Sequence, residues 1–363
     1  MRILHVDTGT VLRGGQELLL LTASGLRELG HAQTIACPEG SALQQAALAA
    51  GFEVLATPAD DHYYLRTAVT IRRRLQEDPH DIVHAHDAHG LTAIWLASLG
   101  LRVKRVAGRQ VIFKPRNLAL HRWKYTRMCD RVVASSAAVR ATLVKNGIPA
   151  GHVATVTGGI RFPERMPGAD ARERMRAEWG LAGDDFVLGH VAAFTAEKGQ
   201  REALDALLML LPRHPRMRLL LLGEGPLRQH PAMLERLGRT GAAAQAPGYY
   251  KPGPDFYAGL DLALVNSTSE ALGLSAIYAM AYGLPVIASN VGGLPTIVTS
   301  GETGWLVPPG DAPALARTIA EAASDPERLR RYGLQARESA RRFSISATAE
   351  RMAAVYQQLL RDE

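Results

Sequence analysis

Short apolar segments alternate along this chain with longer segments of helical periodicity, and this alternation constrains the fold more than any other feature. In the first half we expect strands at ILHVDT, Gln33–Cys37, Glu53–Ala56, Ile82–His86, Val103–Ala107, Arg131–Ala134 and Val153–Val156. In the second half we expect strands at FVLGHVA, RLLLLG, DLALVN, PVIAS and GWLVP. Strands that alternate with helices form parallel sheets with helices packed on their faces. The sequence therefore predicts an α/β protein.

The expected helices are Glu17–Leu29, Ser41–Ala50, Gln200–Leu211, Leu274–Tyr282, Ala312–Ala323, Pro326–Arg341 and Ile345–Arg361. Ser41 is a good N-cap residue, and Gly51 directly follows the segment that it opens. A polar stretch, PERMPGADARERM within Gly158–Gly183, resembles a linker between the two halves. The length of 363 residues suits two domains of ordinary size. We predict two Rossmann-like domains, 1–165 and 166–344, facing a central cleft, with the helix of 345–363 packing back on the first.

Composition narrows the class of protein. Apolar residues make up 47% of the chain and charged residues 21%, as in a soluble globular protein. Cys37 and Cys129 are the only cysteines, so neither a disulfide framework nor a cysteine metal site is predicted. The N-terminus reads as a strand without a targeting segment, and no apolar run approaches the roughly 20 residues of a membrane span. We expect a cytoplasmic protein.

Positive charge is concentrated in one segment. Between Arg102 and Arg131 the chain has ten Lys or Arg residues, with Asp130 as the only acid. The segment is either a solvated surface or a surface for anionic lipid headgroups or a phosphorylated acceptor, since each cation near such a surface contributes about 1 kcal/mol. The candidate acceptor or membrane residues are Arg109, Lys114, Arg116, Arg122 and Lys124. No recognised motif accompanies the charge, so nucleic acid is not an expected partner.

Two turns of the second half have the chemistry of an anion site. STSEALG follows the strand DLALVN, and AAFTAEKGQ follows the strand FVLGHV. In open α/β sheets ligands bind beyond the carboxyl ends of strands, where helix N-termini present free N–H groups. Glu270 can accept hydrogen bonds from sugar hydroxyls, Gly273 allows close backbone approach, and Lys198 can meet a phosphate oxygen. Each pattern alone is weak evidence for an anion site, because a solvated surface lysine or an ordinary strand–turn–helix would have the same sequence.

Two turns of the first half add to this set. Gly14 and Gly15 follow the first strand, without the G-x-G-x-x-G spacing of a dinucleotide site. DIVHAHDAHG contains His84, His86 and His89, of which the first two share a face of the strand. The histidines are either metal ligands or polar groups that position or catalyse. No third ligand at a fixed geometry is evident, so no metal site is predicted.

Taken together, these motifs resemble the retaining GT-B glycosyltransferases of the large family 4 group along nearly the whole chain. The segments that carry the resemblance are GG at 14–15, DIVHAHD at 81–87, EKG at 197–199, LLGEGPLR at 221–228, SEALGL at 269–274, AMAYGLPVIAS at 279–289, VGGLPTIV at 291–298 and GETGWLVPPGD at 301–311. The last four, in order and closely spaced, are the most specific.

The resemblance implies a role for each turn. The second domain would bind a nucleotide-sugar donor and the first domain an acceptor. Lys198 would neutralise the leaving diphosphate, Glu270 would hold the transferred sugar, and His86 would lie near the reacting sugar. The other implied donor-binding residues are Gly14, Gly15, Ala271, Leu272, Gly273, Leu274 and Tyr278. No D-x-D sequence occurs, so lysine and helix dipoles would replace a metal and no cofactor is expected.

The sequence also departs from the family pattern. Tyr278 stands where the family has the second glutamate of E-x7-E, which binds the ribose. Ala193 replaces the family arginine, and Thr296 replaces the acid after G-G-x-P. The Pro-Asn-Gly-Ile-Asp segment appears as Thr157–Arg161 with the sequence TGGIR. We expect Tyr278 to replace the ribose carboxylate and turnover to survive.

The leading hypothesis is a retaining hexosyltransferase that uses a nucleoside-diphosphate sugar, UDP-linked by preference. Its acceptor would be a cell-surface glycan or a lipid-linked molecule such as lipopolysaccharide core, met at the inner face of the cell membrane. An alternative is a degenerate GT-B protein that binds a sugar nucleotide or a partner without turnover. A phosphorylase or epimerase of the same fold is a third hypothesis, for which no specific residue set stands out.

Overall fold

The computed structural model describes residues 1–59, 64–113, 115–168, 170–248 and 253–362. The chain divides into two compact units, one of Met1–Arg161 with Phe343–Glu363 and the other of Phe162–Arg342. These are called the first and the second unit below. The sequence places the same divisions at 165 and 344, whereas the structure places them at Arg161 and Arg342.

The first unit is built on a sheet of seven parallel strands in the order β3-β2-β1-β4-β5-β6-β7. The strands are β1 Arg2–Val6, β2 Ala32–Pro38, β3 Glu53–Thr57, β4 Ile82–Ala85, β5 Lys104–Arg109, β6 Arg131–Ala134 and β7 Val153–Thr155. The helices are α1 Gly14–Glu28, α2 Ala42–Ala49, α3 Leu65–Glu77, α4 Ala88–Ala97, α5 Leu118–Arg127, α6 Ala137–Lys145 and α15 Ile345–Arg361. All seven strands expected from the sequence are present, and the Ser41 side chain caps α2 by accepting from the backbone N–H of Gln44.

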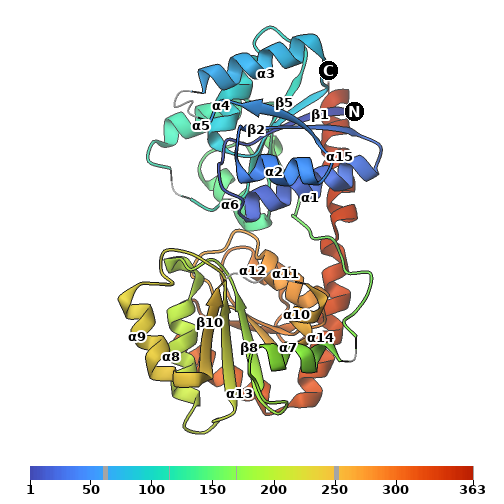
Figure 1. The fold of residues 1–363 in the computed structure, drawn as a ribbon. Coiled ribbons are helices and arrows are strands. Elements are labelled where there is room, and N and C mark those ends of the chain that lie inside the picture. Colours follow the sequence, from blue (N-terminus) through green and yellow to red (C-terminus); the bar gives the residue numbers. More distant parts are fainter. Residues whose placement is uncertain (60–63, 114, 169, 249–252, 363) are drawn as a thin grey trace. The chain divides into compact units, whose positions relative to one another are not determined.

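The C-terminal helix α15 completes the first unit. It packs against α1 although more than 300 residues separate them in sequence (Figure 1). Met352, Tyr356 and Leu359 of α15 lie in one core cluster with Ile3 of β1 and Ile82 of β4. The sheet therefore obtains part of its hydrophobic cover from the last residues of the chain.

The second unit is built on a sheet of six parallel strands in the order β10-β9-β8-β11-β12-β13. The strands are β8 Phe186–Val191, β9 Met217–Leu222, β10 Ala244–Gly248, β11 Leu262–Val265, β12 Val286–Ser289 and β13 Gly304–Val307. The helices are α7 Ala171–Glu178, α8 Gln200–Leu210, α9 Pro231–Thr240, α10 Pro254–Ala258, α11 Leu274–Ala281, α12 Leu294–Ile297, α13 Ala312–Ala323 and α14 Pro326–Ala340.

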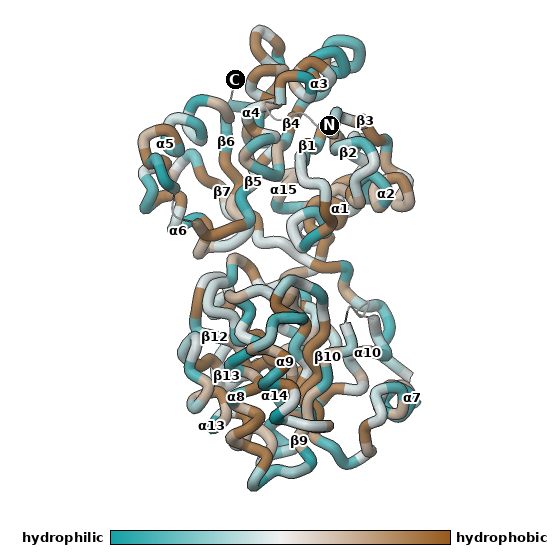
Figure 2. Tube along the Cα trace, turned by 60° about the vertical axis from the view of Figure 1, so that its left-hand side comes forward, coloured by the Kyte–Doolittle hydropathy of each residue, from teal (hydrophilic) through white to brown (hydrophobic). Residues whose placement is uncertain are grey.

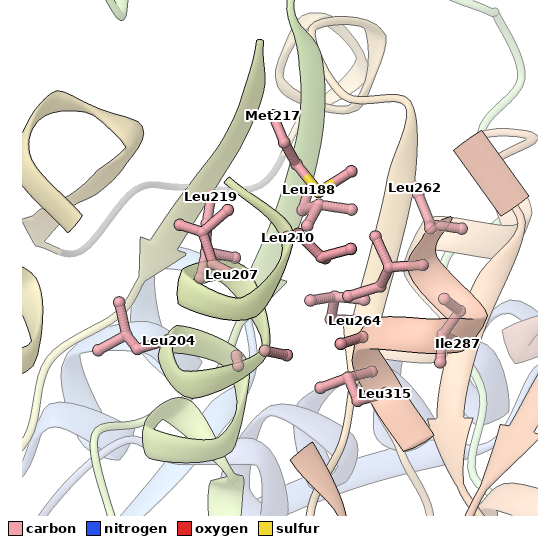
Figure 3. Packing of buried hydrophobic residues seen from close by; sticks show 14 of the residues in the cluster. Leu188, Leu204, Leu207, Leu210, Met217, Leu219, Leu262, Leu264, Ile287 and Leu315 are labelled. Carbon is pink, nitrogen blue, oxygen red and sulfur yellow. The ribbon is translucent and has the colours of Figure 1, made fainter. Parts of the chain in front are cut away.

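A leucine-rich core joins this sheet to its helices. Leu204, Leu207 and Leu210 of α8 meet strand residues such as Leu219 and Leu264 (Figure 3). The three α8 residues lie on one side of the helix because their spacing follows the helical repeat. Hydrophilic residues are prominent on outer helices such as α3 and α7 (Figure 2). Burial of these leucines therefore holds α8 against the sheet.

Two elements of the second unit differ from the sequence-based expectation. Strand β10 has the sequence AQAPG, whose proline and alanines give no apolar alternation, and it lies at the sheet edge where proline is tolerated. Helix α7 lies inside the segment expected to be a linker, because Ala171 and Met175 are buried one turn apart and Trp179 follows them. The linker expectation was wrong for this part.

No helix within the described residues is long and apolar enough to cross a membrane.

Candidate active site

Both sheets have a point where the strand order changes direction, and the motifs of the sequence gather there. In the first unit this point lies between β1 and β4, and in the second unit between β8 and β11. Ligands of open α/β sheets bind beyond the carboxyl ends of the strands at such a switch point. Gly14, Gly15 and His86 follow β1 and β4, whereas Lys198 and Glu270 follow β8 and β11. Each unit thus presents its candidate residues at the expected edge.

Lys198 lies on a short 3-10 turn, Ala196–Lys198, which leads through Gly199 into α8. Gly199 has a φ of 78°, and a Cβ at this position would lie 2.3 Å from the backbone oxygen of Asn266. The buried His190 donates from Nε2 to the Lys198 carbonyl at 2.9 Å, and Asn266 Nδ2 donates to the Gly199 carbonyl at 2.7 Å. Only glycine fits this close approach, so the turn holds Lys198 in place.

Glu270 lies in the loop between β11 and α11 and forms an ion pair with Lys198. The Lys198 Nζ to Glu270 Oε2 distance is 2.7 Å, and the two side chains are 24% and 14% exposed. Ser267 Oγ also donates to Glu270 Oε2 at 3.3 Å. The sequence predicted a role for both residues but not their contact, because 72 residues separate them. The pair offers an ammonium group to an anion beside a carboxylate that accepts from hydroxyl groups.

The loop after Glu270 runs through Ala271 and Leu272 to Gly273, the N-cap of α11. Gly273 has a φ of 101°, and a Cβ there would lie 2.6 Å from the Leu294 side chain. The free N–H groups at the start of α11 are therefore held near the Lys198–Glu270 pair by a turn that requires glycine. Leu274 opens the helix itself.

The residues that depart from the family pattern can now be placed. Tyr278 is half-buried on α11 and lies one turn after Leu274, on the same side of the helix. Ala193 contributes its carbonyl, which accepts from Gln200 Nε2 at 2.8 Å. Thr296 donates from its hydroxyl to the Gly293 carbonyl at 2.7 Å within α12. Neither Ala193 nor Thr296 supplies the charged side chain that the family pattern has there.

Gly14 and Gly15 form the first residues of α1 rather than a loop before it. A Cβ on Gly15 would lie 2.9 Å from the Gln110 side chain, which comes from the segment after β5. The buried carboxyl of Asp7 accepts from Gln16 Nε2 at 3.0 Å and from the Gly9 backbone N–H at 2.8 Å. Burial, together with the neighbouring Asp87, raises the pKa of Asp7 to about 6. Asp7 was missed because a single acid after a strand gives no spacing pattern.

His86 belongs to a cluster of three imidazoles at the carboxyl ends of β1 and β4. His5, which is opposite His84 in the register of the two strands, supplies the third ring that the sequence did not reveal. Potential ligand nitrogens of His5, His84 and His86 all lie within 4.8 Å of one another. Burial lowers the pKa of all three imidazoles, that of His5 to about 4, so the cluster is neutral at pH 7. His89 lies apart and stacks on Tyr64.

A small cavity of about 30 Å³ adjoins this cluster within the first unit. Its lining includes His84, His86, Arg109 and Ser135. Three buried lining atoms have no hydrogen-bond partner among the described residues, namely His84 Nε2, Arg109 Nε and Ser135 Oγ. A cavity of this size and polarity has room for roughly one or two water molecules.

The basic segment does not form one exposed surface. Arg109 is only 7% exposed and stacks on the rings of Phe113 and Tyr125, so its assignment to a membrane surface is corrected. Lys124 is half-buried and donates to the Ala88 carbonyl and to Thr92. Arg116 and Arg122 are exposed, as expected, whereas Lys114 lies outside the described residues.

The exposed part of the segment also carries apolar side chains. Leu118, Leu120 and Trp123 of α5 are 52%, 58% and 44% exposed, next to Arg116 and Arg122 in sequence. Exposed apolar side chains and cations therefore lie next to each other in this part of the chain. The sequence analysis considered only the charge and did not include these residues.

Two units with parallel sheets, each with polar residues at its switch point, have the architecture of the GT-B fold. The family profile of glycosyl transferases group 1 matches residues 171–339, and that of glycosyltransferase family 4 matches residues 12–162. A D-inositol 3-phosphate glycosyltransferase of Catenulispora acidiphila is 31% identical over 82% of this chain and 75% of its own length. The chain therefore belongs to the family 4-like GT-B glycosyltransferases.

Solved structures show the same fold. HepE of Anabaena, in complex with UDP-glucose, has a TM-score of 0.88 at 22% identity, covering 99% of this chain and 100% of its own. WaaG, a glycosyltransferase involved in lipopolysaccharide biosynthesis, has a TM-score of 0.74 at 18% identity, covering 98% and 99% of the two chains. At sequence identities of 22% and 18%, these two comparisons show a shared fold and no more.

Proposed function

We propose that this protein is a retaining hexosyltransferase that takes its sugar from a UDP-linked donor. The observation that carries the proposal is the 2.7 Å ion pair of Lys198 and Glu270, placed after β8 and β11 at the switch point of the second unit. The UDP-glucose complex of HepE, which has the same fold, supports the choice of nucleotide.

In the proposed complex the donor diphosphate meets Lys198 and the free N–H groups at the start of α11. An ammonium group has three donor hydrogens, so Lys198 can contact a phosphate oxygen while it keeps Glu270 in place. Glu270 then accepts hydrogen bonds from hydroxyl groups of the transferred sugar. As the sugar–phosphate bond breaks, negative charge grows on the leaving diphosphate, and a fixed cation and helix N-terminus stabilise it.

Retention of configuration follows if the acceptor attacks from the face that the leaving group vacates. The leaving phosphate then takes the proton of the acceptor hydroxyl, and no separate base is needed. His86, with its pKa lowered by burial, stays neutral and contacts a hydroxyl of the reacting sugar. The charge of the diphosphate is met by Lys198 and helix dipoles, so we expect no metal requirement, and binding of UDP should be unchanged by EDTA.

We further propose that the acceptor is a cell-surface glycan or a lipid-linked molecule such as lipopolysaccharide core, met at the cytoplasmic side of the membrane. The fold likeness to WaaG and the exposed cations and apolar residues of 116–123 support this acceptor class. Charge attraction at a membrane surface is screened by salt. The protein should sediment with vesicles that contain anionic lipid at low salt and be released at high salt, and Arg116→Glu with Arg122→Glu should abolish sedimentation.

The direct test of the reaction is to incubate the protein with UDP-glucose, UDP-GlcNAc or UDP-galactose and to measure the release of UDP, with and without a lipid-linked acceptor. Lys198→Ala should lower turnover by roughly 100-fold or more, because a charge contact to the leaving group is lost. The anomeric configuration of the product, read by NMR, should match that of the donor. UDP binding without any release of UDP would instead favour a degenerate binding protein, whereas an inverted product would refute retention.

A further inference from the structure

The three imidazoles at β1 and β4 are joined by hydrogen bonds whose direction can be worked out. His86 Nε2 lies 2.9 Å from His5 Nδ1, and His5 Nε2 lies 2.8 Å from Gln33 Oε1. Gln33, on the neighbouring strand β2, donates from Nε2 to the His31 carbonyl at 3.0 Å. The chain of contacts thus runs from His86 through His5 and Gln33 to a backbone oxygen.

The His31 carbonyl oxygen, at the end of this series of contacts, determines which atom carries the hydrogen in each hydrogen bond of the series. The His31 carbonyl only accepts, so Gln33 must turn its NH₂ group toward it and its Oε1 toward His5. Oε1 also only accepts, and His5 Nε2 must therefore carry a hydrogen. A neutral imidazole has one N–H, which leaves His5 Nδ1 with a lone pair. The proton between the two rings then belongs to His86 Nε2.

Burial keeps these rings in the neutral form on which the argument depends. His5 is 0% exposed, and desolvation lowers its pKa to about 4. Desolvation also lowers the pKa of His86 well below its usual value, with the neighbouring His84 and His5 adding to the effect. Near neutral pH neither ring takes a second proton that would remove the lone pair of His5 Nδ1.

We propose that Gln33 and His5 are positioning residues that hold His86 in the tautomer with its proton on Nε2 and its lone pair on Nδ1. This inference rests on the proposed role of His86 beside the reacting sugar. A neutral His86 in this state can accept a hydrogen bond from a sugar hydroxyl through Nδ1, and its ring orientation is fixed through Nε2. Neither His5 nor Gln33 touches substrate; both act through His86.

The same three rings invite a competing explanation, a divalent metal site. A metal would need the lone pairs of both His5 Nδ1 and His86 Nε2, whereas in the hydrogen-bonded arrangement His86 Nε2 carries a proton that it donates to His5 Nδ1, which leaves neither lone pair free. His84 holds its Nδ1 at 2.6 Å from the Tyr356 hydroxyl and directs its unpartnered Nε2 to the small cavity. The hydrogen-bonded arrangement and the metal-bound one exclude each other, so one experiment distinguishes them.

The experiment is long-range ¹H–¹⁵N correlation NMR on the full chain with ¹⁵N-labelled histidine. His86→Asn assigns the His86 signals among the twelve histidines. The proposal predicts that His86 is protonated at Nε2 and that His5 is also protonated at Nε2 at pH 8. A His86 protonated at Nδ1 would overturn it. Uptake of one equivalent of zinc chloride, with loss of the Nε2–H signal, would overturn it in favour of a metal site.

Two variants of Gln33 connect the tautomer to catalysis. Gln33→Leu removes the acceptor, so the His86 tautomer should become mixed and kcat for UDP-glucose hydrolysis should fall roughly tenfold, with KM within about twofold. Gln33→Glu keeps an acceptor toward His5 but places a carboxylate oxygen against the His31 carbonyl, so it should not restore the tautomer or kcat. Gln45→Leu, an exposed position on α2, is the matched control. Unchanged tautomer and kcat in Gln33→Leu would refute the positioning role.

Failure of this inference is distinct from failure of the proposed function. Binding of UDP to the second unit can be measured by calorimetry and needs no particular state of His86. If UDP does not bind to the wild-type protein, the proposed function fails while the tautomer of His86 remains measurable. If UDP binds and the wild-type tautomer is Nδ1–H, only the inference about Gln33 and His5 fails.

Discussion

Among single residues, the buried Asp7 should make the free energy of unfolding depend on pH. Its pKa is raised from 3.8 to about 6 by burial and by Asp87. Below pH 3.8 the carboxyl is protonated in both folded and unfolded states and has no effect on stability. Between these values it ionises only when the chain unfolds, so the free energy of unfolding of the wild type should fall as pH rises.

Asp7→Asn removes this titration and keeps an oxygen that can accept from Gln16 and Gly9. The free energy of unfolding of the variant, relative to that of the wild type, should rise as the pH increases from 4 to 6. Above pH 6 the difference should stay constant at about 3 kcal/mol. Urea unfolding of both proteins at pH 4, 5, 6 and 8 measures the difference. A difference that did not change across this range would show that Asp7 is not held protonated by the fold.

Tyr278 is the residue whose departure from the family pattern matters most for the donor. It lies on the same side of α11 as Leu274, whose turn is expected to face the donor phosphates. If it replaces the family glutamate at the ribose, Tyr278→Glu should tighten UDP binding roughly tenfold, the effect of one charged hydrogen bond. Binding of UDP to Tyr278→Phe tests whether the phenol hydroxyl contributes. No change in either variant would place Tyr278 away from the nucleotide.

At the scale of the elements, two glycines separate the effect of backbone strain from that of close packing. Gly180 has a φ of 65° with nothing near its Cβ position, whereas Gly199 combines a φ of 78° with a 2.3 Å approach to Asn266. Gly180→Ala should therefore cost only about 1 kcal/mol of unfolding free energy. Gly199→Ala should cost at least about twice as much and should weaken UDP binding, because the turn that carries Lys198 must shift.

Denaturant unfolding and calorimetry on the two variants measure both effects. Equal losses of stability in Gly180→Ala and Gly199→Ala would contradict the packing argument. Loss of stability in Gly199→Ala with unchanged UDP affinity would show instead that Lys198 does not contact the nucleotide.

Most elements could be predicted from periodicity, and the exceptions have physical reasons. The strands of both sheet centres are buried on two faces and read as apolar runs, which is why β1, β8 and β11 stand out. The edge strand β10 is paired on one side only and needs no such run. Helix α7 was taken for a linker because its five charged residues outweigh the buried Ala171 and Met175.

The candidate site could be predicted less completely. Motifs in local sequence gave Lys198, Glu270, Gly273 and His86, since each lies in a turn after a strand. Partners contributed by distant strands could not be found this way. His5 and Gln33 lie near His86 because β1 pairs with both β2 and β4. The order of strands in a sheet cannot be predicted from the local sequence of any one strand.

At the scale of the whole molecule, the chain returns to its first unit only at its end. Residues 343–363 supply the core residues Met352, Tyr356 and Leu359, while Phe162–Arg342 is continuous in sequence. A fragment of 162–342 should therefore fold and bind UDP on its own. A fragment of 1–161 should fail to fold, because it leaves the apolar surface under α15 open to water.

Circular dichroism and calorimetry on the two fragments test this division. Adding 343–363 to the first fragment through a flexible linker should restore cooperative unfolding. A stable, cooperatively unfolding 1–161 would show that α15 is an accessory to the first unit and not part of its core.

Calorimetric binding of UDP and UDP-glucose to the wild type, Lys198→Ala and Glu270→Gln decides whether the Lys198–Glu270 pair forms the donor site. UDP should bind to the wild type, and its affinity should fall roughly 10- to 100-fold in Lys198→Ala, since a charged contact is lost. Glu270→Gln should keep its affinity for UDP but lose the difference between UDP and UDP-glucose. Equal binding of UDP-glucose to all three proteins would contradict a donor site at the Lys198–Glu270 pair.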